Sequence, residues 1–194
     1  IKDDQTAMSE KLKEAAKAAD MIITTGGVSV GKKDIMHESL RLMGAERIFW
    51  RVKMKPGMPT LFSAYKKTSD ITATDNCVSE REIPIISLSG NPFGVAVSIE
   101  LLIRPALEKM MQDPSIGLKE VNGIMADNFE KGIKGRRFIR AYLENGKFHL
   151  PNGLHSNGVL SSMAGCNCLI DTKTMENQES RSLNAGDKVG AILL

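Results

Sequence analysis

The residues best suited to chemistry lie between Asp20 and Asp34, where the sequence reads DMIITTGGVSVGKKD. A short apolar run is typical of a buried strand in a parallel sheet, and Gly26 and Gly27 break it directly afterwards. Glycines adopt positive φ and let backbone amides approach a ligand, and the N-terminus of a following helix adds N–H groups that favour anions. The stretch therefore predicts a cradle for a phosphate or another oxyanion, although a tight turn between strand and helix needs the same glycines.

Asp34 is the first candidate for acid–base or metal chemistry, because it ends this stretch at the start of a predicted helix. Hard cations such as Mg²⁺ prefer carboxylate oxygens, so Asp34 suits a general base or an Mg²⁺ ligand. An aspartate also suits the N-cap of a helix, and Gly44 stands where the C-cap of this helix belongs. The two roles are compatible. Asp3 and Asp4 also precede a predicted helix, where capping is the simpler interpretation.

Three cationic residues alternate before a proline-rich turn. Residues 47–54 alternate in the manner of a strand, and the period of two places Arg51, Lys53 and Lys55 on one face. The segment Lys55-Pro56-Gly57-Met58-Pro59 then predicts a rigid turn. Cations on one face can converge on one anion, although such a row is also typical of a solvated strand.

Helices and strands alternate in the first half of the chain, which predicts a mainly parallel α/β sheet. The expected elements are helix 5–19, strand 20–25, helix 34–43, strand 47–54, strand 60–64 and strand 83–88, with a loop or hairpin tip at 65–82. A helix at 93–111 follows, and Pro105 should end or kink it near Ile103.

A second glycine loop, Ser89-Gly90-Asn91-Pro92, joins the last of these strands to that helix. Ligands of open α/β sheets bind outside the carboxyl ends of the strands. We therefore expect both glycine loops to border one crevice.

Beyond Asp113 the pattern changes to short apolar runs broken by Gly, Asn and Asp. Residues 144–147 read Glu-Asn-Gly-Lys, a hairpin signal of the Asn-Gly type. Short strands at this spacing need closure to protect their edges, so residues 115–194 predict a small β barrel or sandwich. The expected domains are residues 1–114 and 115–194.

The composition excludes several classes of protein. With 194 residues and a net charge of only +3, the chain lacks the basic surface of a nucleic-acid binder. Apolar runs are too short for a membrane span, and three cysteines suit a reducing compartment, so we expect a cytoplasmic location. The glycines fit neither the dinucleotide fingerprint nor the P-loop. Cys166 and Cys168 lack a second pair of zinc ligands and read as small buried side chains.

Three motifs occur in an order and spacing that resembles a known family. They are T-T-G-G-V-S-V-G-x-x-D at Thr24–Asp34, M-K-P-G-x-P at Met54–Pro59 and S-L-S-G-N-P at Ser87–Pro92. Together they resemble the molybdopterin molybdenumtransferases, the molybdenum insertases related to the gephyrin E domain. The sequence F-x-R at Phe138–Arg140 is similar to the C-terminal β domain of that family.

The resemblance implies a three-layer molybdopterin-binding domain, without its opening strand and helix, followed by the small β domain. It also implies an enzyme that inserts molybdate into adenylylated molybdopterin with Mg²⁺, releases AMP and forms a homodimer when intact. Asp34, Asp3 and Lys55 would be catalytic, and Asp34 would hold the metal. The implied ligand-binding residues are Gly26, Gly27, Ser29, Gly31, Arg51, Pro56, Gly57, Ser89, Gly90, Asn91 and Pro92.

The chain departs from the family pattern at Met58, Ser89 and Gly94, where lysine, proline and serine are usual. Lys32 or Lys33 could replace the cation that is lost at Met58. The departures at Met58 and Gly94 leave open a molybdopterin-binding or sensory paralogue without metal transfer. An adenylyltransferase of related fold is a third alternative, which the β half disfavours. We expect this chain alone to bind molybdopterin weakly and to insert no metal.

Overall fold

The computed structural model describes residues 4–29, 35–68, 80–133, 135–152, 158, 160–172 and 181–194. The chain forms two compact units. The first comprises Ile1–Val52 and Pro59–Gly90, and the second comprises Lys53–Met58 and Asn91–Leu194. The boundary expected at residue 114 remains a prediction about the domains.

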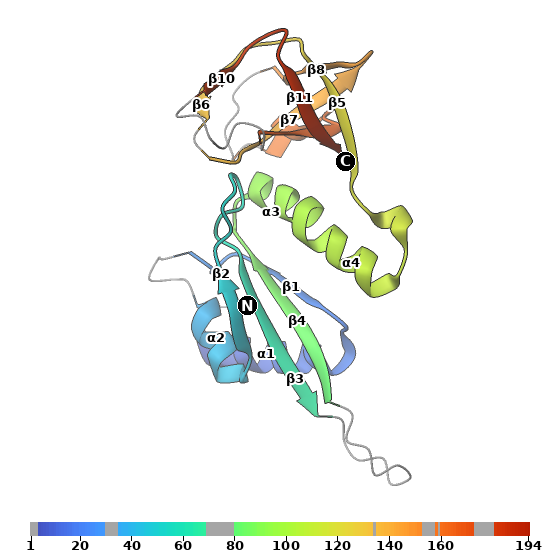
Figure 1. Cartoon of the computed structure of the whole chain (residues 1–194). Coiled ribbons are helices and arrows are strands. Elements are labelled where there is room, and N and C mark those ends of the chain that lie inside the picture. The colour runs from blue at the N-terminus through green and yellow to red at the C-terminus, as the bar shows by residue number, and fades with distance from the viewer. Residues whose placement is uncertain are drawn as a thin grey trace. The chain divides into compact units, whose positions relative to one another are not determined.

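A four-stranded sheet with the order β1-β4-β3-β2 organises the first unit (Figure 1). Only β1 and β4 are parallel, whereas β4 with β3 and β3 with β2 are antiparallel. The expected sheet-and-helix fold is confirmed, but the described sheet is mixed and not mainly parallel. The reason is that a parallel neighbour needs a long crossover, which the short connection from β2 to β3 cannot provide. The strands are β1 (Ile22–Thr25), β2 (Glu46–Trp50), β3 (Leu61–Thr68) and β4 (Glu80–Leu88).

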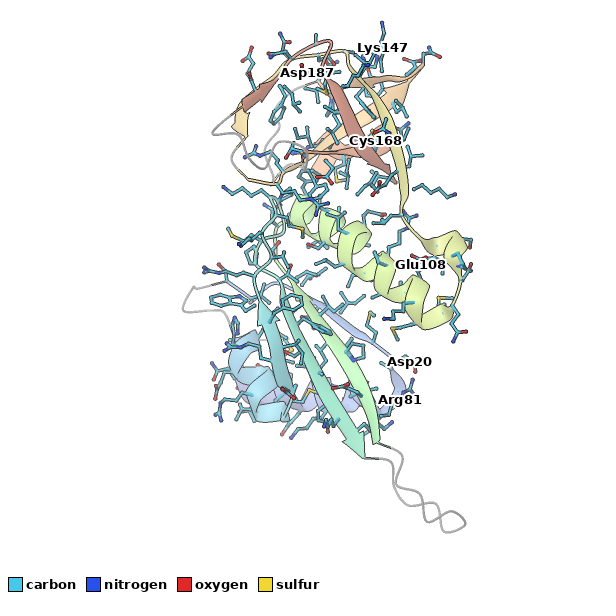
Figure 2. The ribbon with its side chains drawn as sticks, in the orientation of Figure 1. Asp20, Arg81, Glu108, Lys147, Cys168 and Asp187 are labelled. Carbon is cyan, nitrogen blue, oxygen red and sulfur yellow. The ribbon has the colours of Figure 1, made fainter. Side chains whose placement is uncertain are left out.

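Helices α1 (Gln5–Ala18) and α2 (Met36–Met43) pack on the same face of this sheet (Figure 1). Their buried side chains meet those of the central strands, as expected for amphipathic helices on a sheet. The core comprises Leu12, Ala16, Met36, Leu40 and Met43 from the helices and Leu61, Ile83 and Ile85 from the sheet. Asp20, just before β1, forms an ion pair with Arg81 of β4 (Figure 2).

The helix ends test the predicted caps. Asp4 caps α1, since its carboxylate accepts a hydrogen bond from the Ala7 N–H at 2.8 Å. Gly44 ends α2 with φ 88°, as predicted. The N-cap of α2 is Ile35, which offers no side-chain hydrogen bond. The prediction that Asp34 is the N-cap residue is therefore wrong by one position, and Asp34 itself lies outside the described residues.

Strand β2 ends at Trp50, four residues earlier than predicted at the 47–54 segment. Arg51 has φ 73°, in the left-handed region, and this turns the chain out of the sheet. Lys53 and Lys55 then belong to the second unit. The prediction that Arg51, Lys53 and Lys55 share one strand face is therefore wrong, because the period of two holds only while the backbone stays extended.

The second unit begins with a helix that changes its hydrogen-bond pattern midway. It comprises α3 (Pro92–Ser98), a π-helical turn η1 (Ile99–Ile103) and α4 (Arg104–Met111). The Arg104 N–H donates to the Ile99 carbonyl, five residues back, directly before Pro105. Proline has no N–H and clashes with the preceding turn, so the irregularity predicted near Ile103 is confirmed as a π turn.

A closed barrel with the order β11-β5-β8-β7-β9 forms the rest of this unit, which confirms the predicted closure. Its core includes Ile139, Phe148, Cys168 and Ile170, all buried, and Figure 2 marks Cys168 within the barrel. The barrel strands are β5 (Lys119–Met125), β7 (Phe138–Glu144), β8 (Lys147–His149), β9 (Cys168–Asp171) and β11 (Lys188–Leu193). The smaller elements are η2 (Pro114–Ile116), η3 (Leu160–Met163) and a two-stranded sheet of β6 (Phe129–Ile133) and β10 (Arg181–Leu183).

The predicted hairpin between β7 and β8 is confirmed. Asn145 and Gly146 have φ of 49° and 75°, which is the left-handed pair that a tight Asn-Gly turn requires. Among the described residues, no helix is long and apolar enough to cross a membrane.

Candidate anion-binding sites

The first glycine turn is fixed at both of its ends. Gly26 and Gly27 have φ of 88° and 68°, and the Gly26 N–H donates to the Leu88 carbonyl at 2.9 Å. The Met36 N–H donates to the Gly27 carbonyl at 3.1 Å. A Cβ at Gly27 would lie 3.3 Å from the Met36 side chain. Backbone hydrogen bonds therefore hold the turn, which follows β1, against the end of β4 and the start of α2. Its positive φ angles favour glycine.

Consecutive backbone amides follow the turn. The N–H groups of Gly27, Val28 and Ser29 donate to no acceptor among the described residues. The Val28 side chain is only 1% exposed, so the hydrophobic core holds this segment in place. Adjacent N–H groups near a helix N-terminus form an anion-binding concavity, which supports the predicted cradle. The Gly26 amide is already used and cannot contribute.

Three predicted residues of this site, Gly31, Asp34 and Asp3, lie outside the described residues. Within the described part of the chain, no three His, Cys, Asp or Glu side chains are grouped to hold a metal ion. The role of Asp34 toward Mg²⁺ therefore stays a prediction.

The second glycine loop lies beside the first. A Cβ at Gly90 would lie 3.5 Å from the Gly26 Cα, so the two turns are adjacent, in line with the expectation from the strand ends. Ser89 is buried. Asn91 begins α3, because its side-chain oxygen accepts the Gly94 N–H at 3.2 Å, and Pro92 occupies the first turn of that helix. Asn91 and Pro92 thus have a helix-starting role of their own.

The proline-rich segment around Lys55 pairs with the start of β7. The Lys55 N–H donates to the Arg136 carbonyl at 3.0 Å, and the Phe138 N–H donates to the Lys55 carbonyl at 2.8 Å. Gly57 has φ 97°, and a Cβ there would lie 2.7 Å from both the Met54 side chain and the Ser98 hydroxyl. Lys55 is therefore held in a defined place on the barrel unit.

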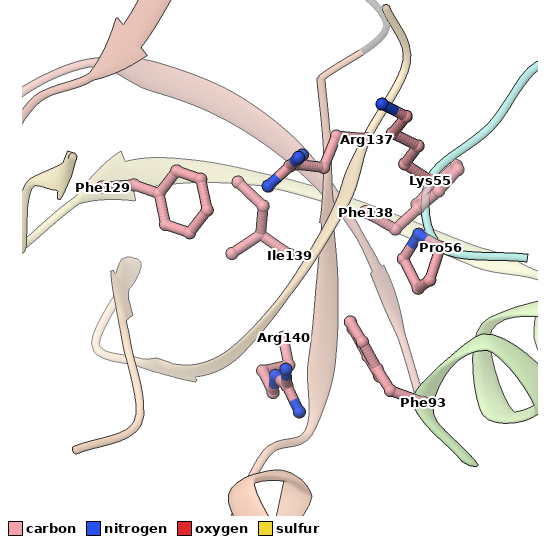
Figure 3. Close-up of a pocket in the computed structure, with 8 residues that line it drawn as sticks. All are labelled: Lys55, Pro56, Phe93, Phe129, Arg137, Phe138, Ile139 and Arg140. Atoms are coloured by element: carbon pink, nitrogen blue, oxygen red, sulfur yellow. The ribbon is translucent and has the colours of Figure 1, made fainter. Parts of the chain in front are cut away.

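A small cationic cavity of about 50 Å³ lies next to this pairing (Figure 3). By the volume that one buried water needs, it holds roughly three to five water-sized groups. That is the size of a tetrahedral oxyanion and too small for a fused heterocycle. The lining comprises Lys55, Pro56, Phe93, Phe129, Arg137, Phe138, Ile139 and Arg140.

The arginines of the cavity occupy different environments. Figure 3 shows Arg137 next to Lys55, and Arg140 beside Phe93 farther along β7. The Arg140 side chain is 2% exposed and its guanidinium lies 4.0 Å from the centre of the Phe93 ring. Burial lowers the pKa of Arg140 from its ordinary value. The buried Nε of Arg137 has no hydrogen-bond partner among the described residues. A buried N–H such as that of the Arg137 Nε is stabilised when an anion enters the cavity and accepts its hydrogen bond.

Sequence reasoning missed Arg137 and Arg140 as site residues. The available signal was an arginine within the apolar strand FIRAYL, because an arginine is rarely fully buried. Arg51 lies in the first unit, so its predicted convergence with Lys55 on one strand is not observed. Met58 is 40% exposed and does not line the cavity.

The fold and these sites define a protein with two candidate anion-binding features, a glycine-turn cradle and a cationic cavity. The chain belongs to the family described as "Probable molybdopterin binding domain", which matches residues 1–109. Residues 122–194 match the family described as "MoeA C-terminal region (domain IV)". The resemblance seen in the motifs is thereby confirmed.

Curated relatives extend over almost the whole chain. A molybdopterin molybdenumtransferase of Staphylococcus aureus is 30% identical over 99% of this chain and 42% of its own length. One of Bacillus subtilis is 28% identical over 88% of this chain and 37% of its own. A crystal structure of a molybdopterin biosynthesis protein of Pyrococcus horikoshii matches with a TM-score of 0.71 and 17% identity, over 98% of this chain and 41% of that one. The chain thus spans about two fifths of these relatives' length, and the structural likeness concerns the fold.

Proposed function

We propose that this chain is part of a molybdopterin molybdenumtransferase that inserts molybdate into adenylylated molybdopterin and releases AMP. The family and the names of the relatives support a role in molybdenum cofactor biosynthesis. The observation that carries the specific reaction is the cationic cavity, because its volume and its three cationic side chains suit a small tetrahedral oxyanion.

Each anionic part of the reaction then has a matching feature in the chain. Molybdate enters the cavity, where Lys55, Arg137 and Arg140 supply positive charge. The phosphate of the pterin substrate binds the amides of Gly27, Val28 and Ser29. Backbone amides bind a phosphate without a titrating side chain, and arginine remains charged at every physiological pH.

The proposal includes Mg²⁺ held by Asp34, a role for Asp3 in the same Mg²⁺-assisted cleavage, and a cytoplasmic homodimer as the complete protein. A bound Mg²⁺ would supply positive charge at the phosphate bond that breaks. The carboxylate of Asp34 has the chemistry for such a ligand, since Mg²⁺ prefers oxygen donors.

Molybdate binding tests the role of the cavity. Equilibrium dialysis of radioactive molybdate should show that Lys55→Ala weakens binding roughly tenfold or more, because a charge-assisted contact contributes about 1.5 to 3 kcal/mol. Lys188→Ala is the matched control, since Lys188 is an exposed lysine of the same unit and does not line the cavity. Equal affinities of the two variants would contradict the assignment.

Release of AMP tests the reaction itself. The complete protein, given adenylylated molybdopterin and molybdate, should form AMP and molybdenum-containing cofactor in equal amounts. Tight binding of both compounds without release of AMP would instead favour the binding or sensory paralogue. The structural argument for that paralogue is the exposed Met58, which stands where lysine is usual in the family.

A further inference from the structure

The single tryptophan of the chain lies against the glycine-turn segment. Trp50 is the last residue of β2 and pairs with Leu61, whose side chain is buried in the core beneath α2. Its indole N–H donates to the Val28 carbonyl at 3.0 Å. The His37 ring meets the indole edge-on at 4.8 Å. Trp50 therefore connects the sheet edge, α2 and the cradle.

Arg51 lies over the ring of this tryptophan. Its guanidinium carbon is 4.2 Å from the centre of the indole ring, a stacking distance for a cation on an aromatic face. The left-handed φ of 73° turns Arg51 out of the strand, and its N–H donates to the Thr60 carbonyl at 2.7 Å. The side chain remains exposed to solvent. The guanidinium is thus held over Trp50, whose indole N–H donates to the Val28 carbonyl of the cradle segment.

We propose that Arg51, held over Trp50, is a specificity-determining residue that stacks on the flat fused heterocycle of a phosphate-bearing ligand. The ligand's phosphate binds at the cradle amides, so this inference rests on the proposed function. The adenine of an adenylyl group and the pterin ring share the required chemistry, which is a flat π-system linked to a phosphate. In this role the flat guanidinium of Arg51 stacks on the heterocycle, and a positive charge alone does not provide that contact.

The difference between arginine and lysine makes this role measurable. A guanidinium stacks on an aromatic face with its delocalised plane, whereas the ammonium of lysine is a compact, strongly hydrated charge. Stacking and cation–π contacts predict that the heterocycle strengthens binding roughly fivefold or more in the native protein. Replacing Arg51 by lysine keeps the charge for the phosphate and removes the plane for the heterocycle.

Three probes separate the two contributions: AMP, neopterin monophosphate and ribose 5-phosphate. All carry one phosphate, but ribose 5-phosphate has no heterocycle. Binding to the 194-residue chain is followed by the fluorescence of Trp50, which is the sole tryptophan, and by isothermal titration calorimetry. The variants are Arg51→Lys and, as a control, Arg47→Lys, an exposed arginine of β2.

The native chain and Arg47→Lys should bind at least one heterocyclic phosphate roughly fivefold more tightly than ribose 5-phosphate. Arg51→Lys should lose this preference and keep its affinity for ribose 5-phosphate within about twofold. A preference that persists in Arg51→Lys, or is absent from the native chain, overturns the stacking role. If ribose 5-phosphate does not bind but the heterocyclic preference depends on Arg51, the phosphate cradle fails and the stacking role stands. The stronger of AMP and neopterin monophosphate identifies the heterocycle.

Discussion

Replacing Thr172 by valine should loosen the strand that carries the cationic cavity. The Thr172 hydroxyl accepts the Arg137 N–H at 2.7 Å, and the Thr172 N–H donates to the Arg137 carbonyl at 3.0 Å. Next to them, Asp171 accepts two hydrogen bonds from the Arg136 guanidinium, at 3.0 and 2.7 Å. Because Arg136 accepts the Lys55 N–H, these contacts position both Lys55 and Arg137.

The size of the effect follows from burial. Thr172 is 1% exposed, so valine leaves the Arg137 N–H without an acceptor at a cost of about 1 to 3 kcal/mol. For a chain of this length, 1 kcal/mol corresponds to roughly 2 to 4 °C in melting temperature. We therefore expect Thr172→Val to melt about 2 to 12 °C lower in a circular dichroism scan, and to bind molybdate more weakly.

Thr172→Ser separates hydrogen bonding from packing. Serine keeps the acceptor and removes one methyl group, which costs about 0.8 kcal/mol. The hydrogen bond predicts that the valine variant melts below the serine variant, whereas packing alone predicts the opposite order. A valine variant that melts at or above the serine variant would refute the reasoning.

Three further outcomes are expected. Asp34→Asn in the complete protein should keep adenylylated molybdopterin bound and stop AMP release, because the amide removes the charge for Mg²⁺; turnover within a few fold of native would remove Asp34 from the reaction. Gly57→Ala should lower the melting temperature strongly, since its Cβ would lie 2.7 Å from Met54 and Ser98 at a φ of 97°, and an unchanged melting temperature would contradict this. Burial raises the pKa of the Cys168 thiol from 9.0 to about 12, so the unfolded chain ionises first and stability falls as pH rises through that window. Urea unfolding at about pH 8 and about pH 11 should show a smaller loss in Cys168→Ala than in the native chain.

Local sequence determined the turns, the caps at Asp4 and Gly44, and the class of fold. Gly26, Gly27 and Gly44 have positive φ where glycine was predicted to supply it, and Asn145-Gly146 forms the expected hairpin turn. These features were predictable because a backbone conformation that only a few residue types adopt is encoded within a few positions. Short runs broken by Gly, Asn and Asp likewise predicted the barrel, since short strands need closure to protect their edges.

Tertiary structure alone decided where the charged side chains lie. Lys55 meets Arg137 because distant segments pair through backbone hydrogen bonds, which depend on no particular side chain. The left-handed φ of Arg51 turns the chain out of β2 after Trp50. The strand alternation therefore ends before Arg51 and Lys55, which it was expected to place on one face. Arg140 is buried against Phe93 from another element of the second unit. Sequence patterns report local periodicity, whereas an anion site depends on contacts between segments far apart in the chain, and only folding brings those together.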